Sequence, residues 1–162
     1  MNSQTYIIVV DDNPDDRDLV KRALPKRHTS KLREFDSEGD FRERFLDEIS
    51  EEYLTEHNFP HLLFLDLRLE HNKSGIEILK EIRSNQYLKS IPVIMISSSD
   101  KDDDVMDAFL NGANLYVVKG EDDKVFTRTI KEILRSINRA GKMPSDVPGN
   151  LILEKYSNNE NI

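Results

Sequence analysis

The chain has 162 residues, of which 37% are hydrophobic and 33% charged, with a formal net charge of −8. This length corresponds to one ordinary domain, and the acidic balance argues against binding nucleic acid by neutralising its phosphates. Because the sequence has no cysteine, disulfides, thiolate metal sites and cysteine nucleophiles are excluded. No apolar run is as long as a transmembrane helix, so we expect a soluble cytoplasmic protein without a membrane partner.

The first part of the chain alternates short apolar runs with segments of helical period. Tyr6–Val10 predicts a buried strand. Asn13-Pro14 predicts the start of a helix that Pro25 ends, because asparagine is a good N-cap and proline suits the first helical position. Lys31–Phe35 alternates in polarity and predicts a strand nearer an edge, and the segment from Asp40 to Glu56 predicts one long helix.

The same alternation continues to residue 138. Strands are predicted at His61–Leu65, Pro92–Ile96 and Leu115–Val118. Helices are predicted from Ser74-Gly75 onward, from Asp102 to Asn111 and from Asp122 to Asn138. Gly112 is expected to end the second of these three helices, since glycine favours the position after a helix.

Five strands and five helices in strict alternation define the expected fold class. The pattern predicts an α/β protein with a doubly wound, five-stranded parallel sheet, a flavodoxin-like (βα)5 three-layer sandwich. We expect residues 1–140 to form this domain and residues 141–162 to form a C-terminal extension that is partly ordered at most. Leu151–Leu153 could pack along the last helix or onto a second copy, so a homodimer is one alternative and disorder is the other.

Polar residues stand at the carboxyl ends of four predicted strands, where ligands bind in such sheets. They are Asp11 and Asp12, Asp66, Ser97 and Ser98, and Lys119. Carboxylates brought together repel one another unless a cation joins them, and magnesium prefers such oxygen ligands. A carboxylate nucleophile, a metal, an ammonium group and a hydroxyl group together indicate a phosphoryl-transfer site.

Each of these residues also has a simpler structural interpretation. Asp11 and Asp12 could cap the following helix, the serines could form a polar loop, and Lys119 could be solvated. Asp66 is harder to explain in this way, because an acid between apolar residues is costly without a partner. The four features at the ends of four strands favour the functional interpretation.

Four segments carry a resemblance to a known family: VVDD at 9–12, FLDL at 64–67, PVIMIS at 92–97 and GANLYVVK at 112–119. In these motifs, their order and their spacing, the chain resembles the receiver domain of two-component response regulators over about residues 5 to 138. Residues 91–119 resemble most the stand-alone regulators that accompany phytochrome-type and other hybrid sensor kinases.

The resemblance implies a role for each motif residue. Asp66 would accept a phosphoryl group from a sensor histidine kinase or a phosphotransfer protein. Asp11, Asp12, Asp66 and the backbone carbonyl of Arg68 would hold Mg²⁺. Lys119 would pair with the phosphoryl group. Ser97 and Tyr116 would be switch residues, although Tyr116 could equally be an aromatic residue that covers the core.

The chain departs from the family pattern in three places. The loop after Asp66 lacks the usual proline, and its Gly75 comes one residue late, so that Asn72 or Lys73 could approach the site. Lys119 is followed by Gly120 instead of a proline, which leaves open whether that peptide bond is cis or trans. The third departure is the segment 39–60, which is longer and more acidic than a minimal second helix.

The expected function is a phosphoacceptor switch with an unknown downstream protein partner. It is not an enzyme, apart from slow loss of its own phosphoryl group at most. Two alternatives remain. One is a receiver-fold scaffold that works without phosphorylation. The other, a magnesium-dependent aspartyl-phosphate phosphatase, usually has two aspartates two residues apart, whereas Asp11 and Asp12 are adjacent.

Overall fold

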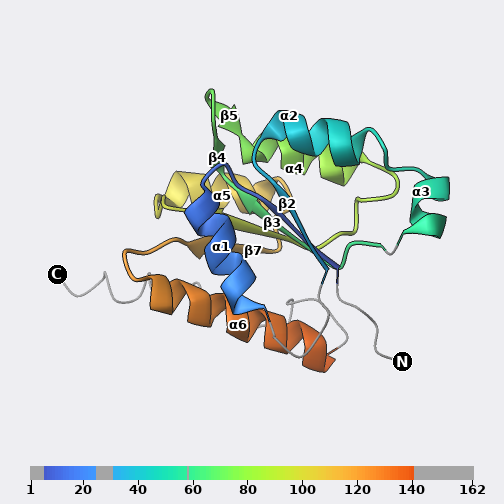
Figure 1. The fold of residues 1–162 in the computed structure, drawn as a ribbon. Helices are drawn as coiled ribbons and strands as arrows, with labels where there is room; N and C mark the ends of the chain where they lie inside the picture. Colours follow the sequence, from blue (N-terminus) through green and yellow to red (C-terminus); the bar gives the residue numbers. More distant parts are fainter. Residues whose placement is uncertain (1–5, 25–30, 58, 141–162) are drawn as a thin grey trace.

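The computed structural model describes residues 6–24, 31–57 and 59–140, with backbone alone at 137–140. Its centre is a parallel sheet of five strands in the order β2-β1-β3-β6-β7 (Figure 1). The strands are β1 (Tyr6–Val10), β2 (Lys31–Phe35), β3 (Leu62–Asp66), β6 (Val93–Ser97) and β7 (Leu115–Val118). This confirms the predicted fold class, and β2 lies at the edge as expected.

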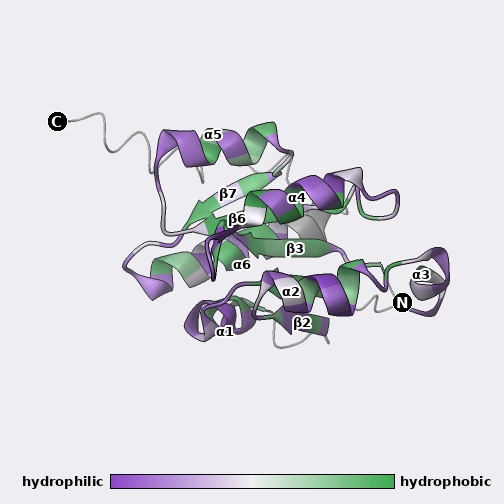
Figure 2. Cartoon of the chain, turned by 90° about the horizontal axis from the view of Figure 1, so that it is seen from above, coloured by the Kyte–Doolittle hydropathy of each residue, from purple (hydrophilic) through white to green (hydrophobic). Residues whose placement is uncertain are grey.

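Helices cover both faces of the sheet and so complete three layers. On one face lie α1 (Pro14–Ala23) and α6 (Asp123–Ala140), which pack against each other. The other face carries α2 (Glu38–Phe41), the π-helix η1 (Arg42–Leu46), α4 (Gly75–Ser84) and α5 (Asp102–Leu110). The strands therefore lie between two helical layers. In Figure 2, β3 and β7 are coloured as hydrophobic, whereas the helices and the edge strand β2 have mixed colours.

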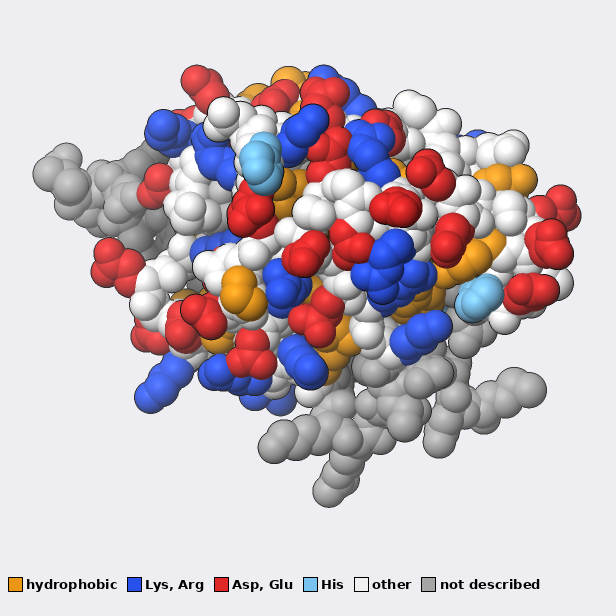
Figure 3. Space-filling model, turned by 45° about the horizontal axis from the view of Figure 1, so that its top comes forward, with side chains coloured by type: hydrophobic (Ala, Val, Ile, Leu, Met, Phe, Trp, Pro, Cys, Tyr) orange, Lys and Arg blue, Asp and Glu red, His pale blue; other side chains and the backbone are white. Residues whose placement is uncertain are grey.

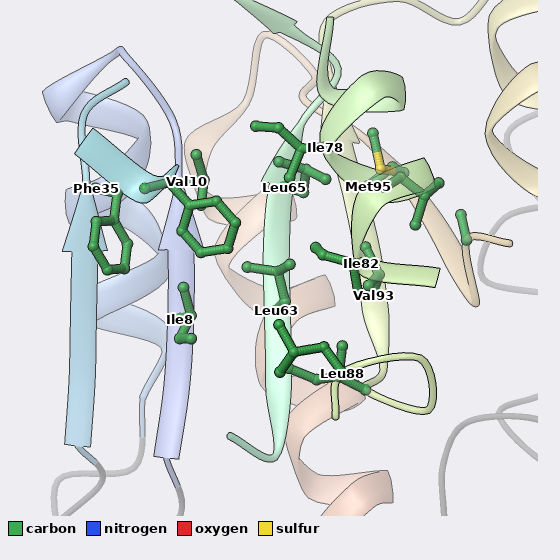
Figure 4. Close-up of a cluster of buried hydrophobic side chains, with 14 of the residues drawn as sticks. Ile8, Val10, Phe35, Leu63, Leu65, Ile78, Ile82, Leu88, Val93 and Met95 are labelled. Atoms are coloured by element: carbon green, nitrogen blue, oxygen red, sulfur yellow. The ribbon is translucent and has the colours of Figure 1, made fainter. Parts of the chain in front are cut away.

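The core consists of two hydrophobic clusters, one on each face of the sheet. Residues of one strand alternate between them: Ile8 and Val10 belong to the cluster beneath α4, and Ile7 and Val9 to the cluster beneath α1 and α6. Figure 4 shows the first cluster, where Leu63 and other strand side chains meet those of α4. Burial on both faces explains why the strands other than β2 have near-continuous apolar sequences.

The local signals for helix ends are confirmed. The side chain of Asn13 accepts a hydrogen bond from the backbone N–H of Asp15, and Pro14 is the first residue of α1. Ser74 caps α4 in the same way through the N–H of Ile76. Gly112, with a φ of 100°, follows α5 in the left-handed conformation that glycine adopts most readily.

The single long helix predicted from Asp40 to Glu56 is wrong. The structure has α2 and η1, then a break, and then the short helix α3 (Glu51–Glu56). The cause is Ser50, whose hydroxyl oxygen accepts a hydrogen bond from the N–H of Tyr53 at 3.1 Å and so starts a new helix. Before the break, the rings of Phe41 and Phe45 stack 5.2 Å apart and hold η1 against the sheet.

An antiparallel hairpin after β3 was not predicted. It pairs β4 (Arg68–Leu69) with β5 (Lys73–Ser74). His71 and Asn72 have φ values of 59° and 57° in its turn, as a tight hairpin turn requires at its two central residues. This hairpin accommodates the longer loop that the sequence has before Gly75.

One face of the molecule is mixed in charge, and exposed hydrophobic side chains occur elsewhere, on α5 (Met106, Phe109 and Leu110). Seen from the side of α2 and α4, acidic and basic side chains alternate (Figure 3). Among the described residues, no helix is both long enough and apolar enough to cross a membrane. The prediction for residues 141–162, including packing by Leu151–Leu153, lies outside the described residues.

Candidate functional site

Three carboxylates meet at the carboxyl end of the sheet. Asp11 and Asp12 directly follow β1, and Asp66 is the last residue of the neighbouring strand β3. One oxygen from each of the three side chains can be chosen so that all three oxygens lie within 4.8 Å of one another. Asp11 is fully buried, and Asp66 is 6% exposed. The structure therefore brings together the acidic residues that the sequence singled out.

The backbone around Asp11 is held by several hydrogen bonds. Its N–H donates to the carbonyl of Phe35 at 3.1 Å, and its carbonyl accepts from the Arg17 guanidinium at 2.7 Å. One oxygen of its carboxylate accepts from the N–H of Asn13 at 2.9 Å. The first turn of α1 and the edge strand thus set the position of this carboxylate.

The start of α4 at Gly75 passes very close to the end of β3 at Asp66. The N–H of Gly75 donates to the carbonyl of Leu67 at 2.8 Å, and a Cβ atom on Gly75 would lie 2.0 Å from the carbonyl oxygen of Asp66. The carboxylate of Asp66 accepts from the N–H of Arg68 at 3.3 Å. Only glycine allows α4 to begin this close to the strand end.

Lys119 brings one positive charge into the acidic group. Its ammonium nitrogen lies 2.7 Å from Asp11, 2.7 Å from Asp16 and 3.5 Å from Asp66. Its backbone N–H donates to the carbonyl of Ser97 at 2.7 Å and fixes it beside β6. No peptide bond in the described residues is cis, so the bond between Lys119 and Gly120 is trans.

Burial and charge shift the pKa values of these groups. Desolvation and, next, repulsion by Asp11 raise the pKa of Asp66 to about 7. Desolvation likewise raises the pKa of Asp11, although Lys119 opposes it. Burial disfavours the charged form of Lys119, but attraction by Asp11 and Asp66 outweighs it and raises the pKa of the ammonium group. The positive charge of Lys119 thus only partly compensates the negative charges of the carboxylates.

The switch residues predicted from the sequence meet at Ser99, which sequence reasoning missed. The Ser99 N–H donates to the hydroxyl oxygen of Ser97 at 3.0 Å. The carbonyl of Ser99 accepts from the hydroxyl of Tyr116 at 2.8 Å, and the Ser99 hydroxyl donates to Asp104. Tyr116 is 1% exposed and packs in the core. Its position is therefore compatible both with a switch residue bonded to Ser99 and with an aromatic residue that covers the core.

Arg68 connects this network to the phosphoacceptor candidate. Its guanidinium donates to Asp104 at 2.9 Å, while its own N–H bonds to Asp66. The hydrogen bond from Ser99 lowers the pKa of Asp104, and Arg68 adds to this effect. A continuous chain of contacts therefore runs from the end of β3 to the first turn of α5.

Two residues predicted to approach the site lie elsewhere. The ammonium group of Lys73 is 3.7 Å from Glu38 of α2, and Asn72 is exposed in the turn of the hairpin. Both residues belong to the hairpin of β4 and β5, whose turn depends on the positive φ values of His71 and Asn72. The loop length did not reveal this geometry.

Asp16 is the second functional candidate that the sequence analysis missed. It lies one helical turn after the cap of α1 and pairs with a lysine 103 positions later. The helical period that placed Leu19 and Val20 on the buried side of α1 also restricts where Asp16 can point. That signal alone does not identify the partner, because Lys119 directly follows the distant strand β7.

Comparison with known proteins identifies the family. The family model described as "Response regulator receiver domain" matches residues 7–131, and the chain therefore belongs to the receiver-domain family of response regulators. The acidic group at the end of β1 and β3 lies within the matched segment.

Cyanobacterial regulators are among the similar structures. The phosphorylated cyanobacterial phytochrome response regulator RcpA has 26% sequence identity and a TM-score of 0.73, over 87% of this chain and 98% of that one. The Mn²⁺-bound form of response regulator Rcp1 has 32% identity and a TM-score of 0.66, over 80% and 91% of the two chains.

Curated sequences are similar to this chain over shorter segments. Rcp1 from Synechocystis sp. is 35% identical over 78 residues, which is 48% of each protein. The probable methanogenesis regulatory protein FilR2 from Methanothrix harundinacea is 36% identical over 76 residues, 47% of this chain and 48% of that protein. The chain thus spans about half the length of these curated relatives.

Proposed function

We propose that the protein is a phosphorylation switch that accepts one phosphoryl group on Asp66. The observation that carries this proposal is the position of Lys119, whose ammonium nitrogen lies 3.5 Å from Asp66 and 2.7 Å from Asp11. A buried carboxylate beside an ammonium group and two further carboxylates has the components of a phosphoryl-transfer site. The family and the phosphorylated state of RcpA support the same function.

The acidic group suits a magnesium ion. Asp11, Asp12 and Asp66 offer hard oxygen ligands close together, and the pKa of Asp66 is raised by burial first and then by repulsion from Asp11, which a cation would relieve. The carbonyl of Arg68 is the fourth proposed ligand. When bound, the ion would neutralise the carboxylates and a phosphoryl group beside them. Rcp1 with bound Mn²⁺ supports a divalent ion in this fold.

The proposed reaction transfers a phosphoryl group between side chains. A carboxylate oxygen of Asp66 attacks the phosphorus of a phosphohistidine, an O–P bond forms, and the P–N bond breaks so that the imidazole leaves with the electron pair. Lys119 holds positive charge beside the phosphoryl oxygens. The donor would be a sensor histidine kinase or phosphotransfer protein, of the phytochrome-associated kind by analogy with RcpA.

The first experiment measures phosphoryl uptake from acetyl phosphate. Intact mass spectrometry should detect one added phosphoryl group that requires magnesium and that is lost in Asp66→Asn. Asp12→Asn should lower the rate at a fixed magnesium concentration by about ten-fold or more, because a direct ligand is removed. Absence of uptake by folded, magnesium-bound protein would contradict the proposal and favour a scaffold that works without phosphorylation.

Ser97 is the proposed link between the phosphoryl group and the output surface. In the structure its hydroxyl oxygen accepts from the N–H of Ser99. If the hydroxyl turns to a phosphoryl oxygen, the Ser99 N–H loses this partner and Tyr116 and α5 respond through the same loop. The surface of α5, β7 and α6 would then change its affinity for the downstream protein. The size of this change is set by how differently that protein binds the phosphorylated and unphosphorylated conformations.

This link predicts a change in amide hydrogen exchange. Phosphorylation should speed exchange of the Ser99 amide about five-fold, the effect of about 1 kcal/mol on a local opening equilibrium. Ser97→Ala should still be phosphorylated but show no such change, whereas Ser98→Ala, at the exposed neighbouring position, should respond like wild type. An unchanged response in Ser97→Ala, measured by NMR, would contradict this route.

A further inference from the structure

The ammonium group of Lys119 has a partner outside the acidic group. Asp16, in the first half of α1, lies 2.7 Å from it, as close as Asp11. Both ends of this contact are shielded, because the side chains of Lys119 and Asp16 are 14% and 20% exposed. Such shielding makes the ion pair stronger than an exposed surface pair, since solvent screens it less.

The three carboxylates around Lys119 differ in their other roles. Asp11 and Asp66 belong to the group proposed to hold magnesium, and their oxygens would face that ion. Asp16 is not in that group, and the ion pair that the structure shows for its carboxylate is with Lys119. In the described part of the chain it is therefore the carboxylate that can hold Lys119 whether or not Asp11 and Asp66 are engaged.

The backbone after Lys119 gives a further reason for such a tether. The next residue is Gly120, an exposed glycine without the ring that restricts a proline. On the preceding side, the N–H of Lys119 is anchored to the carbonyl of Ser97. The long side chain beyond that anchor loses much rotamer freedom when it is held in one place, and Asp16 reaches it from α1.

We propose that Asp16 is a positioning residue, which holds the Lys119 ammonium group beside Asp66 for phosphoryl transfer. This rests on the proposed function of Asp66. Asp16 does not touch the phosphoryl donor in this proposal. It acts through Lys119 and would keep the positive charge where the phosphoryl oxygens arrive, so that less reorganisation is needed during transfer.

The test compares Asp16→Asn with Asp15→Asn. Both remove one negative charge from the same turn of α1, but Asp15 is exposed and Asp16 faces Lys119. With acetyl phosphate and magnesium, Asp16→Asn should lower the maximal rate of uptake about five-fold without raising the half-saturating acetyl phosphate concentration, and Asp15→Asn should change it less than about two-fold. Equal effects of the two substitutions would overturn the proposal.

A double-mutant cycle separates positioning from general electrostatics. In a Lys119→Ala background, Asp16→Asn should have no further effect on uptake, because the group that it positions is absent. A loss as large as in the wild-type background would overturn the proposal.

A second readout does not depend on phosphoryl transfer. In ¹⁵N NMR at low temperature, the Lys119 ammonium signal should be visible in wild type and in Asp15→Asn and should broaden in Asp16→Asn. An unchanged signal in Asp16→Asn would overturn the tether. If wild-type protein accepts no phosphoryl group, the proposed function fails, and the ammonium signal alone still decides whether Asp16 holds Lys119.

Discussion

Replacing Gly75 with alanine is expected to destabilise the protein by about 3 kcal/mol or more, because the added methyl group overlaps a backbone atom. The new Cβ would lie 2.0 Å from the carbonyl oxygen of Asp66 and 3.3 Å from the side chain of Leu65. Backbone cannot move aside as a flexible side chain can, so α4 must shift away from β3. Urea unfolding of wild type and variant measures the loss.

The same shift is expected to slow phosphoryl uptake, since the displaced backbone carries Asp66 itself. Gly39→Ala is the matched control: a Cβ there meets nothing within 4 Å, and alanine in helix α2 should add about 0.5–1 kcal/mol of stability. A Gly75→Ala variant as stable as wild type would show that the close crossing of α4 over β3 is not maintained in solution.

Asp66→Asn is expected to stabilise the metal-free protein at pH 8 by about 2 kcal/mol, or about 4–8 °C in melting temperature. Burial and the charge of Asp11 raise the pKa of Asp66 to about 7. The folded protein therefore binds this proton more tightly than the unfolded chain does. Stability is lost as pH rises from the ordinary value near 4 to about 7, and it stays lost above that.

Thermal unfolding in a chelator, from pH 4 to pH 8, checks this sign. The advantage of Asp66→Asn should be largest at pH 8 and small near pH 4, where the Asp66 carboxyl of the folded protein is neutral. Asp15→Asn, which removes an exposed charge, should follow wild type. Magnesium should stabilise wild type more at pH 8 than at pH 5, as it compensates the ionised carboxylates. If instead wild type became more stable relative to Asp66→Asn as the pH rose, the raised pKa of Asp66 would be contradicted.

The two expectations have a common physical basis. The candidate site places like charges together in a buried position, and it needs Gly75 so that α4 can begin beside the end of β3. The first feature costs desolvation and repulsion, and the second leaves no room for a side chain at residue 75.

The sequence by itself determined the fold class and the main acidic group. Strand-length apolar runs and helical periods are local patterns, and the rule that parallel strand ends share one edge converts them into a site. Asp11, Asp12, Asp66 and Lys119 could therefore be chosen before any coordinates. The caps at Asn13 and Ser74 and the end of α5 at Gly112 were also accessible, because capping depends on neighbouring residues.

Tertiary structure decided most of the remaining features. The hairpin after Asp66 and the network at Ser99 depend on how one segment packs against another, whereas the break before α3 has a local signal, the cap at Ser50, that the sequence analysis missed. Asp16 is the clearest case: its helix position follows from sequence, but its partner Lys119 lies 103 positions away, directly after β7. Periodicity records which side of an element is buried, whereas an ion pair between distant elements depends on how those elements are placed in space, and that placement follows only from packing of the whole core.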